Sequence, residues 1–244
     1  LSGKAQFNQD LATGDIQVAS GAQLVMAGGK TASVGGTLSG SGNWTGGNGV
    51  LLDAGAKVAP AGNDVGIIND AGGLLTFDSG AVYEWQISAA TGEAGVNWDL
   101  LKGAGPSFVG NLVFRVDNSL FAGLLDGTEE FTVASFSSAV TGFDSGNVIF
   151  DLPEGWSGGV LTMVDNDLVL SGLATSLPGD TNGDGVVDAT DYIAVKQHIG
   201  ATTGATKADG DFDGDGDVDW TDLQTLMSGF NAAGAAGGAT VPEP

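Results

Sequence analysis

The sequence predicts a mainly β protein of two units: strands stacked on one another under an antiparallel β cap, then a small helical module. Three observations lead to this prediction. Short apolar runs separated by glycine turns fill the first part of the chain, longer runs with wider loops follow residue 98, and one Asp-rich loop occurs twice near the C-terminus. Gly makes up 43 of 244 residues, yet 42% of the chain is hydrophobic, more than a disordered chain would carry. The glycines are therefore expected in tight turns of a folded protein.

The charge balance excludes several classes of function. Seven Lys and Arg stand against 30 Asp and Glu, a formal net charge of −23. Such a chain repels nucleic acid and anionic membranes and attracts cations. Cysteine is absent and His198 is the only histidine, which excludes a disulfide framework and disfavours a His-based zinc site. No run approaches the roughly 18 apolar residues of a membrane span, so no membrane insertion is expected.

Residues 1–178 are expected to form the β body. Short apolar runs in its first part are typical of strands, at residues 16–18, 24–26, 50–52, 74–77 and 82–87. A local motif, apolar-x-small-Gly-Ala-x-apolar, recurs around Gly21, Gly55 and Gly80. One such unit cannot bury its apolar face alone, which favours strands that stack on copies of themselves. An ordinary β-sandwich with similar turns is the alternative.

Two segments of this region carry a family resemblance. Gly36–Trp44 and Ala54–Asn63 resemble the β-helical passenger and autotransporter-associated repeats of bacterial surface proteins. The resemblance covers residues 15–90 and implies a short, right-handed parallel β-helix. Asp64–Ile68 departs from the usual repeat, so the number of rungs stays open.

Residues 98–173 have longer strand patterns, which predict an antiparallel cap. The runs lie at residues 112–116, 131–136, 148–152, 160–164 and 168–170. Asp165-Asn166-Asp167 is typical of a hairpin turn, because Asp and Asn tolerate the turn conformation. A cap is physically needed, since the open end of a β stack exposes unpaired backbone groups.

The most specific pattern lies between residues 180 and 222. Oxygen-bearing side chains occupy positions 1, 3, 5, 9 and 12 of a loop with Gly at position 6, and the same spacing returns 31 residues later. Ca²⁺ takes roughly six to eight oxygen ligands, including a backbone carbonyl from position 7. The sequence therefore predicts two calcium ions. The expected ligands are Asp180, Asn182, Asp184, Val186, Asp188 and Asp191 in the first loop and Asp211, Asp213, Asp215, Asp217, Asp219 and Asp222 in the second.

A helix is expected after each loop. Tyr192, Val195 and Ile199 share one face of the first helix, and Gly200 stands where a glycine would end it. The corresponding face of the second helix holds Leu223, Leu226, Met227 and Phe230. His198 is expected at the C-terminal end of the first helix, where a cation interacts favourably with the helix dipole.

Two such loops, each closed by Asp and followed by one helix, resemble the type I dockerin, an EF-hand-like module. The resemblance runs from residue 179 to residue 231 and implies a cohesin-like partner. It places the contacts at the residues just before each last ligand, here Ala189-Thr190 and Trp220-Thr221. Trp220 breaks the near-symmetry of the two halves. Its side chain is expected either to pack internally or to contact a partner.

Residues 232–244 form a tail rich in Gly and Ala. Its last four residues, Val241-Pro242-Glu243-Pro244, resemble the start of a PEP-CTERM sorting signal. This resemblance implies export, so an extracellular or cell-surface location in a bacterium is expected.

No convincing catalytic set emerges, and the chain is predicted not to be an enzyme. The carboxylates of Glu84, Glu93, Glu129, Glu130 and Glu154 cannot be paired across a cleft from the sequence. The predicted function is that of an extracellular calcium-binding structural or assembly protein, self-associating as a homo-oligomer or surface filament. The alternative is a polysaccharide-associated adhesin or a scaffold-docked module of a carbohydrate-active system. Its candidate surface aromatics are Trp44, Trp85, Trp98 and Trp156.

Overall fold

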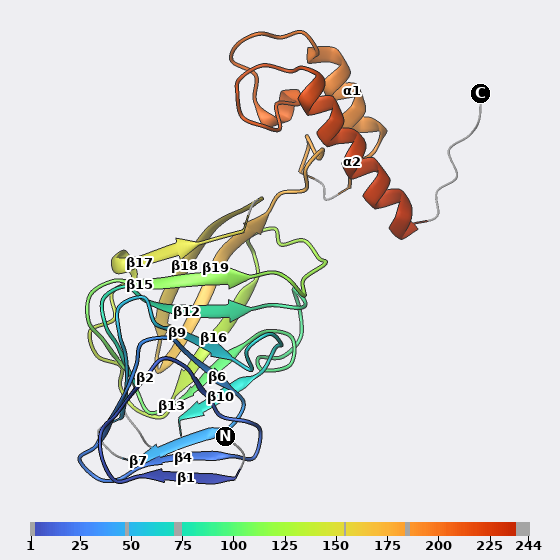
Figure 1. Cartoon of the computed structure of the whole chain (residues 1–244). Coiled ribbons are helices and arrows are strands. Elements are labelled where there is room, and N and C mark those ends of the chain that lie inside the picture. The colour runs from blue at the N-terminus through green and yellow to red at the C-terminus, as the bar shows by residue number, and fades with distance from the viewer. Residues whose placement is uncertain (1–2, 47–48, 71–74, 154, 184–185, 238–244) are drawn as a thin grey trace. The chain divides into compact units, whose positions relative to one another are not determined.

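The computed structural model describes all residues except 1–2, 47–48, 71–74, 154, 184–185 and 238–244 (Figure 1). The chain divides into two compact units, Leu1–Ala174 and Thr175–Pro244. Each unit is described by itself, with the labels of Figure 1.

Three sheets make up the first unit. The first sheet has the order β1 (Lys4–Phe7), β4 (Gln23–Met26), β7 (Asn43–Gly46), β10 (Ile67–Asp70), β13 (Leu100–Gly103), β16 (Glu130–Phe136), β19 (Asp167–Thr175) and β18 (Trp156–Val164). The second has the order β14 (Ser107–Phe108), β11 (Leu75–Phe77), β8 (Gly49–Leu52), β5 (Thr31–Val34) and β2 (Leu11–Thr13). The third has the order β17 (Val148–Asp151), β15 (Leu112–Asp117), β12 (Ala81–Gln86), β9 (Lys57–Pro60), β6 (Thr37–Gly40) and β3 (Ile16–Gln17).

This strand order is that of a parallel β-helix. Up to β16, the chain visits the three sheets in turn, and successive strands of each sheet lie three places apart in the chain and pair in parallel. β17 then pairs in parallel with β15. Lys4 lies opposite Gln23, and Gln23 in turn lies opposite Asn43. The predicted β-helix is confirmed, and the β-sandwich alternative does not hold.

The core of the first unit lies inside the coil, and in strands such as β5, β6 and β15 alternate residues are buried there. Leu24, Leu38, Leu52 and Val58 are completely buried there. The Gly-Ala motif marks corners of the coil. Gly55 and Gly80 have φ of +78° and +84°, a conformation that glycine adopts without strain, and the Gly55 N–H donates to the Gly80 carbonyl at 3.0 Å.

The antiparallel segment is shorter than predicted and covers one end of the first sheet. The prediction for residues 98–151 was wrong, because β13, β15 and β17 pair in parallel and continue the coil. β19 pairs antiparallel with β16, and Phe131 lies opposite Leu170. β18 and β19 are joined by a turn in which Asp165 has a φ of +55°, the conformation expected for its hairpin. The ring of Phe131 contacts the buried rings of Trp85 and Trp98, so the cap and the coil share one core.

The second unit holds two helices, α1 (Ala189–His198) and α2 (Trp220–Gly237), and a 3₁₀ turn, η2 (Lys207–Asp209). The buried core consists of Val187, Val195, Val218 and Leu226. α1 ends before Gly200, whose φ of +91° fits the predicted C-terminal glycine.

The predicted helix faces are only partly buried. Val195 and Leu226 are fully enclosed, but Tyr192, Ile199 and Met227 are 41%, 50% and 52% exposed. The reason is that the inward positions next to the loops belong to Asp191 and Asp222, which are completely buried. The buried carboxylates of Asp191 and Asp222 therefore occupy part of the interior that the helical periodicity predicted for apolar side chains.

α2 continues to Gly237, into the segment predicted as a tail, which fits the high helix propensity of its Ala residues. The PEP-CTERM-like segment lies outside the described residues. Among the helices that the structure describes, none is both long and apolar enough to cross a membrane.

Candidate metal centre

The last carboxylate of each loop is held in the first turn of the following helix. Asp222 Oδ1 accepts the Phe212 N–H at 2.7 Å, and Oδ2 accepts the Asp219 N–H at 2.8 Å. In the first loop, Asp191 accepts the N–H groups of Thr181 and Asp188, each at 2.8 Å. A buried carboxylate therefore ties the start of each loop to its end.

The first carboxylate of each loop shapes the turn that contains the glycines. Asp180 Oδ1 accepts the Gly183 N–H, and Asp211 Oδ1 accepts the Gly214 N–H, both at 2.7 Å. Asp211 Oδ2 also accepts the Gly216 N–H at 2.9 Å. These hydrogen bonds repeat with the 31-residue offset of the sequence pattern, so the two loops have the same local fold around their first and last carboxylates.

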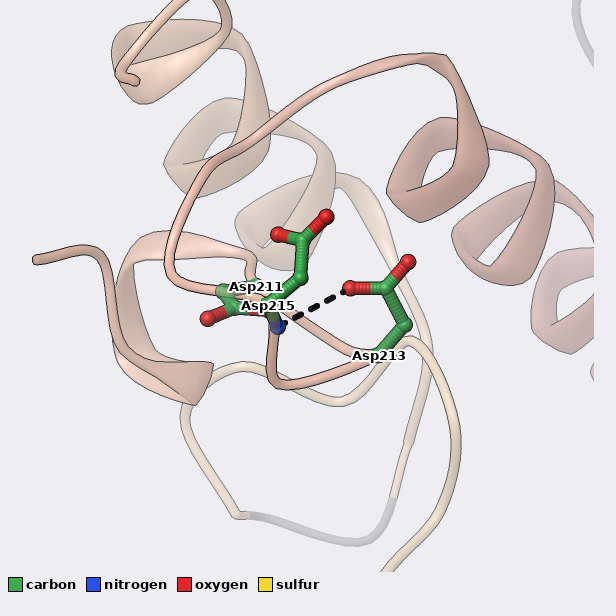
Figure 2. A group of neighbouring side chains, drawn as sticks. All are labelled: Asp211, Asp213 and Asp215. Atoms are coloured by element: carbon green, nitrogen blue, oxygen red, sulfur yellow. Dashed lines mark hydrogen bonds between the residues drawn. The ribbon is translucent and has the colours of Figure 1, made fainter. Parts of the chain in front are cut away.

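Carboxylates converge in the second loop (Figure 2). Ligand oxygens of Asp211, Asp213 and Asp215 lie within 4.8 Å of one another. Two oxygens bound to one Ca²⁺ at about 2.4 Å lie at most about 4.8 Å apart, so this spacing fits the ion. In the first loop, Asp184 lies outside the described residues.

The carboxylate of Asp217 is a further candidate ligand in the second loop that the sequence did not predict. Ligand oxygens of Asp217, Asp219 and Asp222 also lie within 4.8 Å of one another. Asp217 was expected to contribute only its backbone carbonyl. Its Oδ1 is buried and accepts no hydrogen bond from the described residues. The sequence feature that could have indicated this ligand is the Asp at position 7 of the second loop, where the first loop has the exposed Val186.

Desolvation and the charges of neighbouring carboxylates raise two carboxyl pKa values in this loop. Desolvation, followed by the charges of Asp215 and Asp219, raises the pKa of Asp217. For Asp213, the hydrogen bond from the Asp215 N–H lowers the pKa, but desolvation and neighbouring carboxylates together outweigh it. The loop thus holds negative charges that destabilise one another, and a divalent cation would relieve this repulsion.

The first loop shows the opposite effect at its last carboxylate. Desolvation acts to raise the pKa of Asp191, but hydrogen bonds from Asp188, Thr181 and Asn182 outweigh it, and the pKa is lowered. Asp191 is therefore held as a charged oxygen ligand. Both loops present hard anionic oxygens, the ligand type that Ca²⁺ prefers.

Other candidate residues have structural surroundings. His198 Nδ1 lies 2.9 Å from the Ala194 carbonyl, and Nε2 lies 3.4 Å from Asp209, so the ring sits at the end of α1 as expected. Glu84 pairs with Lys57 at 2.7 Å and with Arg115 at 3.7 Å.

The candidate surface aromatics lie mostly in the core. Trp44, Trp85 and Trp98 are 2%, 0% and 7% exposed. Trp156 is half-buried, and its ring contacts that of Phe121. These four side chains therefore form no aromatic platform for a sugar ring.

Comparison with known proteins identifies the second unit. Residues 178–231 match the family model described as the dockerin type I domain. No curated protein and no solved structure matches the chain. Dockerin modules bind Ca²⁺, dock to cohesin partners, and are typically extracellular or bound to the cell surface. The predicted dockerin module is confirmed, whereas the resemblances of the β body and of the last four residues stay predictions.

Proposed function

We propose that this protein attaches a β-helical body to a cohesin-type partner outside a bacterial cell, through a module held in shape by two Ca²⁺ ions. The observation that carries the proposal is the duplicated set of carboxylate hydrogen bonds in the two loops. Both loops fold alike around their first and last carboxylates. This holds even though the residue that follows the first carboxylate is Thr181 in one loop and Phe212 in the other. What the loops share is the geometry that an ion requires.

One ion is assigned to each loop. In the second loop, the side chains at positions 1, 3, 5, 9 and 12 face the ion together with the carbonyl of Asp217, and the Asp217 carboxylate adds a further oxygen. In the first loop, Asn182 and the carbonyl of Val186 complete a set of four carboxylates. Each set supplies at least six oxygens, which suits Ca²⁺.

Calorimetric titration of the full chain with Ca²⁺ tests this assignment. We expect two sites per chain, with Asp191→Asn and Asp222→Asn each removing or greatly weakening one of them. Asp165→Asn, in the hairpin of the body, is the matched control and should leave both sites intact. One site or none in the wild-type chain would contradict the proposal.

Docking is tested separately with purified type I cohesin modules. Binding of the full chain should need Ca²⁺ and should disappear with a chelator, because the loops hold the helices in place. Binding that is unaffected by chelation would show that the ions have no part in docking.

Assembly into a filament stays a prediction. Bound Ca²⁺ would offset up to four of the charges that make identical chains repel. Light scattering with and without Ca²⁺, on the full chain and on a chain ending at Asn231, measures this. Monomers under all four conditions would exclude the filament.

A further inference from the structure

The outer face of the third sheet carries polar side chains that stack from coil to coil. β6, β9 and β12 are successive strands of this sheet (Figure 1), and β3 precedes them. Gln17 lies opposite Ser39, and Thr37 lies opposite Lys57. Each of these residues is more exposed than the inward residue next to it, so their side chains point outward. Strands lie about 4.8 Å apart in a sheet, so groups from successive coils line up at this spacing along the coil axis.

A loop beside this face makes part of it a groove. Ala59 lies opposite Ser39 on the outer face, yet it is only 2% exposed. The chain turns directly after Ala59, where the Gly62 N–H donates to the Ala59 carbonyl at 3.1 Å. The cavity next to this loop has a volume of about 490 Å³, within the range of ligand sites. Residues from four strands and the loop line it, among them Gln17, Ser39, Glu84 and Asn63.

The turn of this loop has a strained backbone. Ala61 has a φ of +57°, and among the residues that the structure describes only Asp165 also has a positive φ without being glycine. Asp tolerates this conformation in a turn, whereas the Cβ of Ala makes it unfavourable. Gly at position 61 would relieve the strain but would remove the methyl group that lines the cavity. Strain of this kind is found at binding sites, where the surrounding structure maintains it.

The chemistry of the lining disfavours anionic and apolar ligands. Of the described residues that line the groove, Lys57 is the one cation, and its ammonium lies 2.7 Å from a Glu84 carboxylate oxygen. Asp64 adds a second carboxylate, so the groove has a net negative charge. The apolar part of the lining consists of the small side chains of Ala59 and Ala61. The remaining hydroxyl and amide groups both donate and accept hydrogen bonds, which suits the hydroxyl groups of a neutral sugar.

We propose that this groove of the first unit binds a neutral polysaccharide, with the sugar chain along the coil axis across β3, β6, β9 and β12. Successive sugar residues then meet polar groups from successive coils. Thr37, Ser39 and Asn63 exchange hydrogen bonds with the sugar hydroxyls, and the methyl groups of Ala59 and Ala61 contact the C–H groups of a sugar ring. The site uses no aromatic platform, and it does not depend on the proposed docking function.

The test is calorimetric titration of the Ca²⁺-loaded full chain with neutral hexasaccharides of glucose, xylose and mannose, and with hexagalacturonate as an anionic probe. Ser39→Leu fills the groove. Thr76→Leu is its matched control, since Thr76 also points outward between two buried residues of a parallel strand, in the second sheet. Ala61→Gly removes only the methyl group, and Asp165→Gly is its control, because that substitution also relieves a positive φ. Thermal unfolding checks that all four variants fold.

We expect at least one neutral hexasaccharide to bind and hexagalacturonate not to bind. Ser39→Leu should weaken binding at least about tenfold, and Thr76→Leu less than about twofold. Ala61→Gly should weaken binding about threefold without lowering the melting temperature, while Asp165→Gly leaves binding unchanged. The inference is wrong if no neutral hexasaccharide binds, if hexagalacturonate binds as tightly as the neutral sugars, or if Ser39→Leu weakens binding no more than Thr76→Leu does. The cohesin-binding experiment is unaffected by any of these results.

Discussion

The hydroxyl of Tyr83 donates a hydrogen bond to a backbone carbonyl in the core of the β-helix. The side chain is 1% exposed in the β-helix core and donates to the Val133 carbonyl at 2.6 Å. Val133 lies where the register of β16 against β19 shifts, between Thr132 and Ala134. Burial, followed by the charge of Asp99, raises the pKa of Tyr83 well above its usual value, so the hydroxyl keeps its proton.

We predict that Tyr83→Phe lowers the free energy of unfolding of the body by about 1–3 kcal/mol, because a buried carbonyl loses its donor. Denaturant unfolding followed by strand circular dichroism measures this. Tyr192→Phe removes an exposed hydroxyl and is the control. Equal stability of Tyr83→Phe and wild type would mean that the carbonyl finds another donor.

Asp99 is a buried carboxyl that joins two parts of the coil. It is 1% exposed, and it accepts the Gly66 N–H at 2.8 Å and the Gln86 N–H at 3.0 Å. Desolvation raises its pKa from 3.8 to about 8, against the two hydrogen bonds, with further repulsion from Asp117 and Glu84. The folded chain therefore keeps this proton over a pH range in which the unfolded chain releases it.

We predict that the body loses stability as the pH rises from about 4 to about 8. In this range the unfolded state binds fewer protons than the folded state, so the free energy of unfolding falls with pH. Urea unfolding at pH 5, 7 and 9 measures the slope. Asp99→Asn cannot ionise and should show a flatter slope than wild type, even if its absolute stability is lower. Parallel slopes for the two proteins would exclude Asp99 as the cause.

At the scale of elements, the coil grows along the chain. The turn from Lys4 to Gln23 holds 19 residues, that from Asn43 to Asn69 holds 26, and that from Leu101 to Ala134 holds 33. Because the length of a turn changes along the chain, the number of rungs cannot be obtained by searching the sequence for a single repeat length. The 25-residue offset from Gly55 to Gly80 is a true turn of the coil, since these residues are hydrogen-bonded neighbours. The offset from Gly21 to Gly55 is not a whole turn of the coil, because Gly21 precedes β4 of the first sheet and Gly55 precedes β9 of the third.

The two loops are unequal elements. The first carries four Asp and Asn182, and the second carries six Asp, including Asp213 at the position equivalent to Asn182. Calcium affinity of such loops depends on the number of charged ligands. The second loop should therefore be the tighter site.

We predict two distinguishable affinities, and exchanging one ligand should bring them together. Asp213→Asn should weaken the tighter site and Asn182→Asp should strengthen the weaker one, each by roughly tenfold. Calorimetry on the full chain measures both sites. Asp217→Val, which copies Val186 of the first loop, tests the additional carboxylate. Unchanged affinities in all three variants would show that charge count does not set them.

For the whole molecule, the sequence predicted what depends on nearby residues. The loops are local, so their ligand spacing was readable, as was the hairpin at Asp165. The parallel pairing of residues 98–151 depends on distant strands and was not readable. Contacts between distant residues were not: the Tyr83 hydroxyl reaches a carbonyl 50 residues away. The sequence also could not show that Asp99 is a structural carboxyl and not a metal ligand. That distinction depends on its burial and its hydrogen-bond partners, which no local pattern encodes.

The two units differ greatly in the apolar core that stabilises them. Among the side chains that the structure describes, the second unit has a buried apolar core of Val187, Val195, Val218 and Leu226. The first has a continuous core that includes the stacked rings of Phe77 and Phe108, 4.8 Å apart. A core this small offers little to offset the repulsion among the loop carboxylates, so we expect the binding free energy of Ca²⁺ to contribute to folding of the second unit.

We predict that chelating Ca²⁺ unfolds residues 179–231 and leaves the β-helix folded. Circular dichroism should lose its helical component and keep its strand component, and excess Ca²⁺ should restore the helices. Hydrogen exchange of the full chain would locate the change: amides of α1 and α2 should lose protection on chelation, while amides of β12 and β15 should keep it. The Asp191→Asn and Asp222→Asn double variant should resemble the chelated protein even in Ca²⁺, because each substitution removes the carboxylate that joins a loop to its helix. Persistence of protected helices after chelation would show that the apolar core alone folds the module, and the ions would then have to act on docking and not on folding.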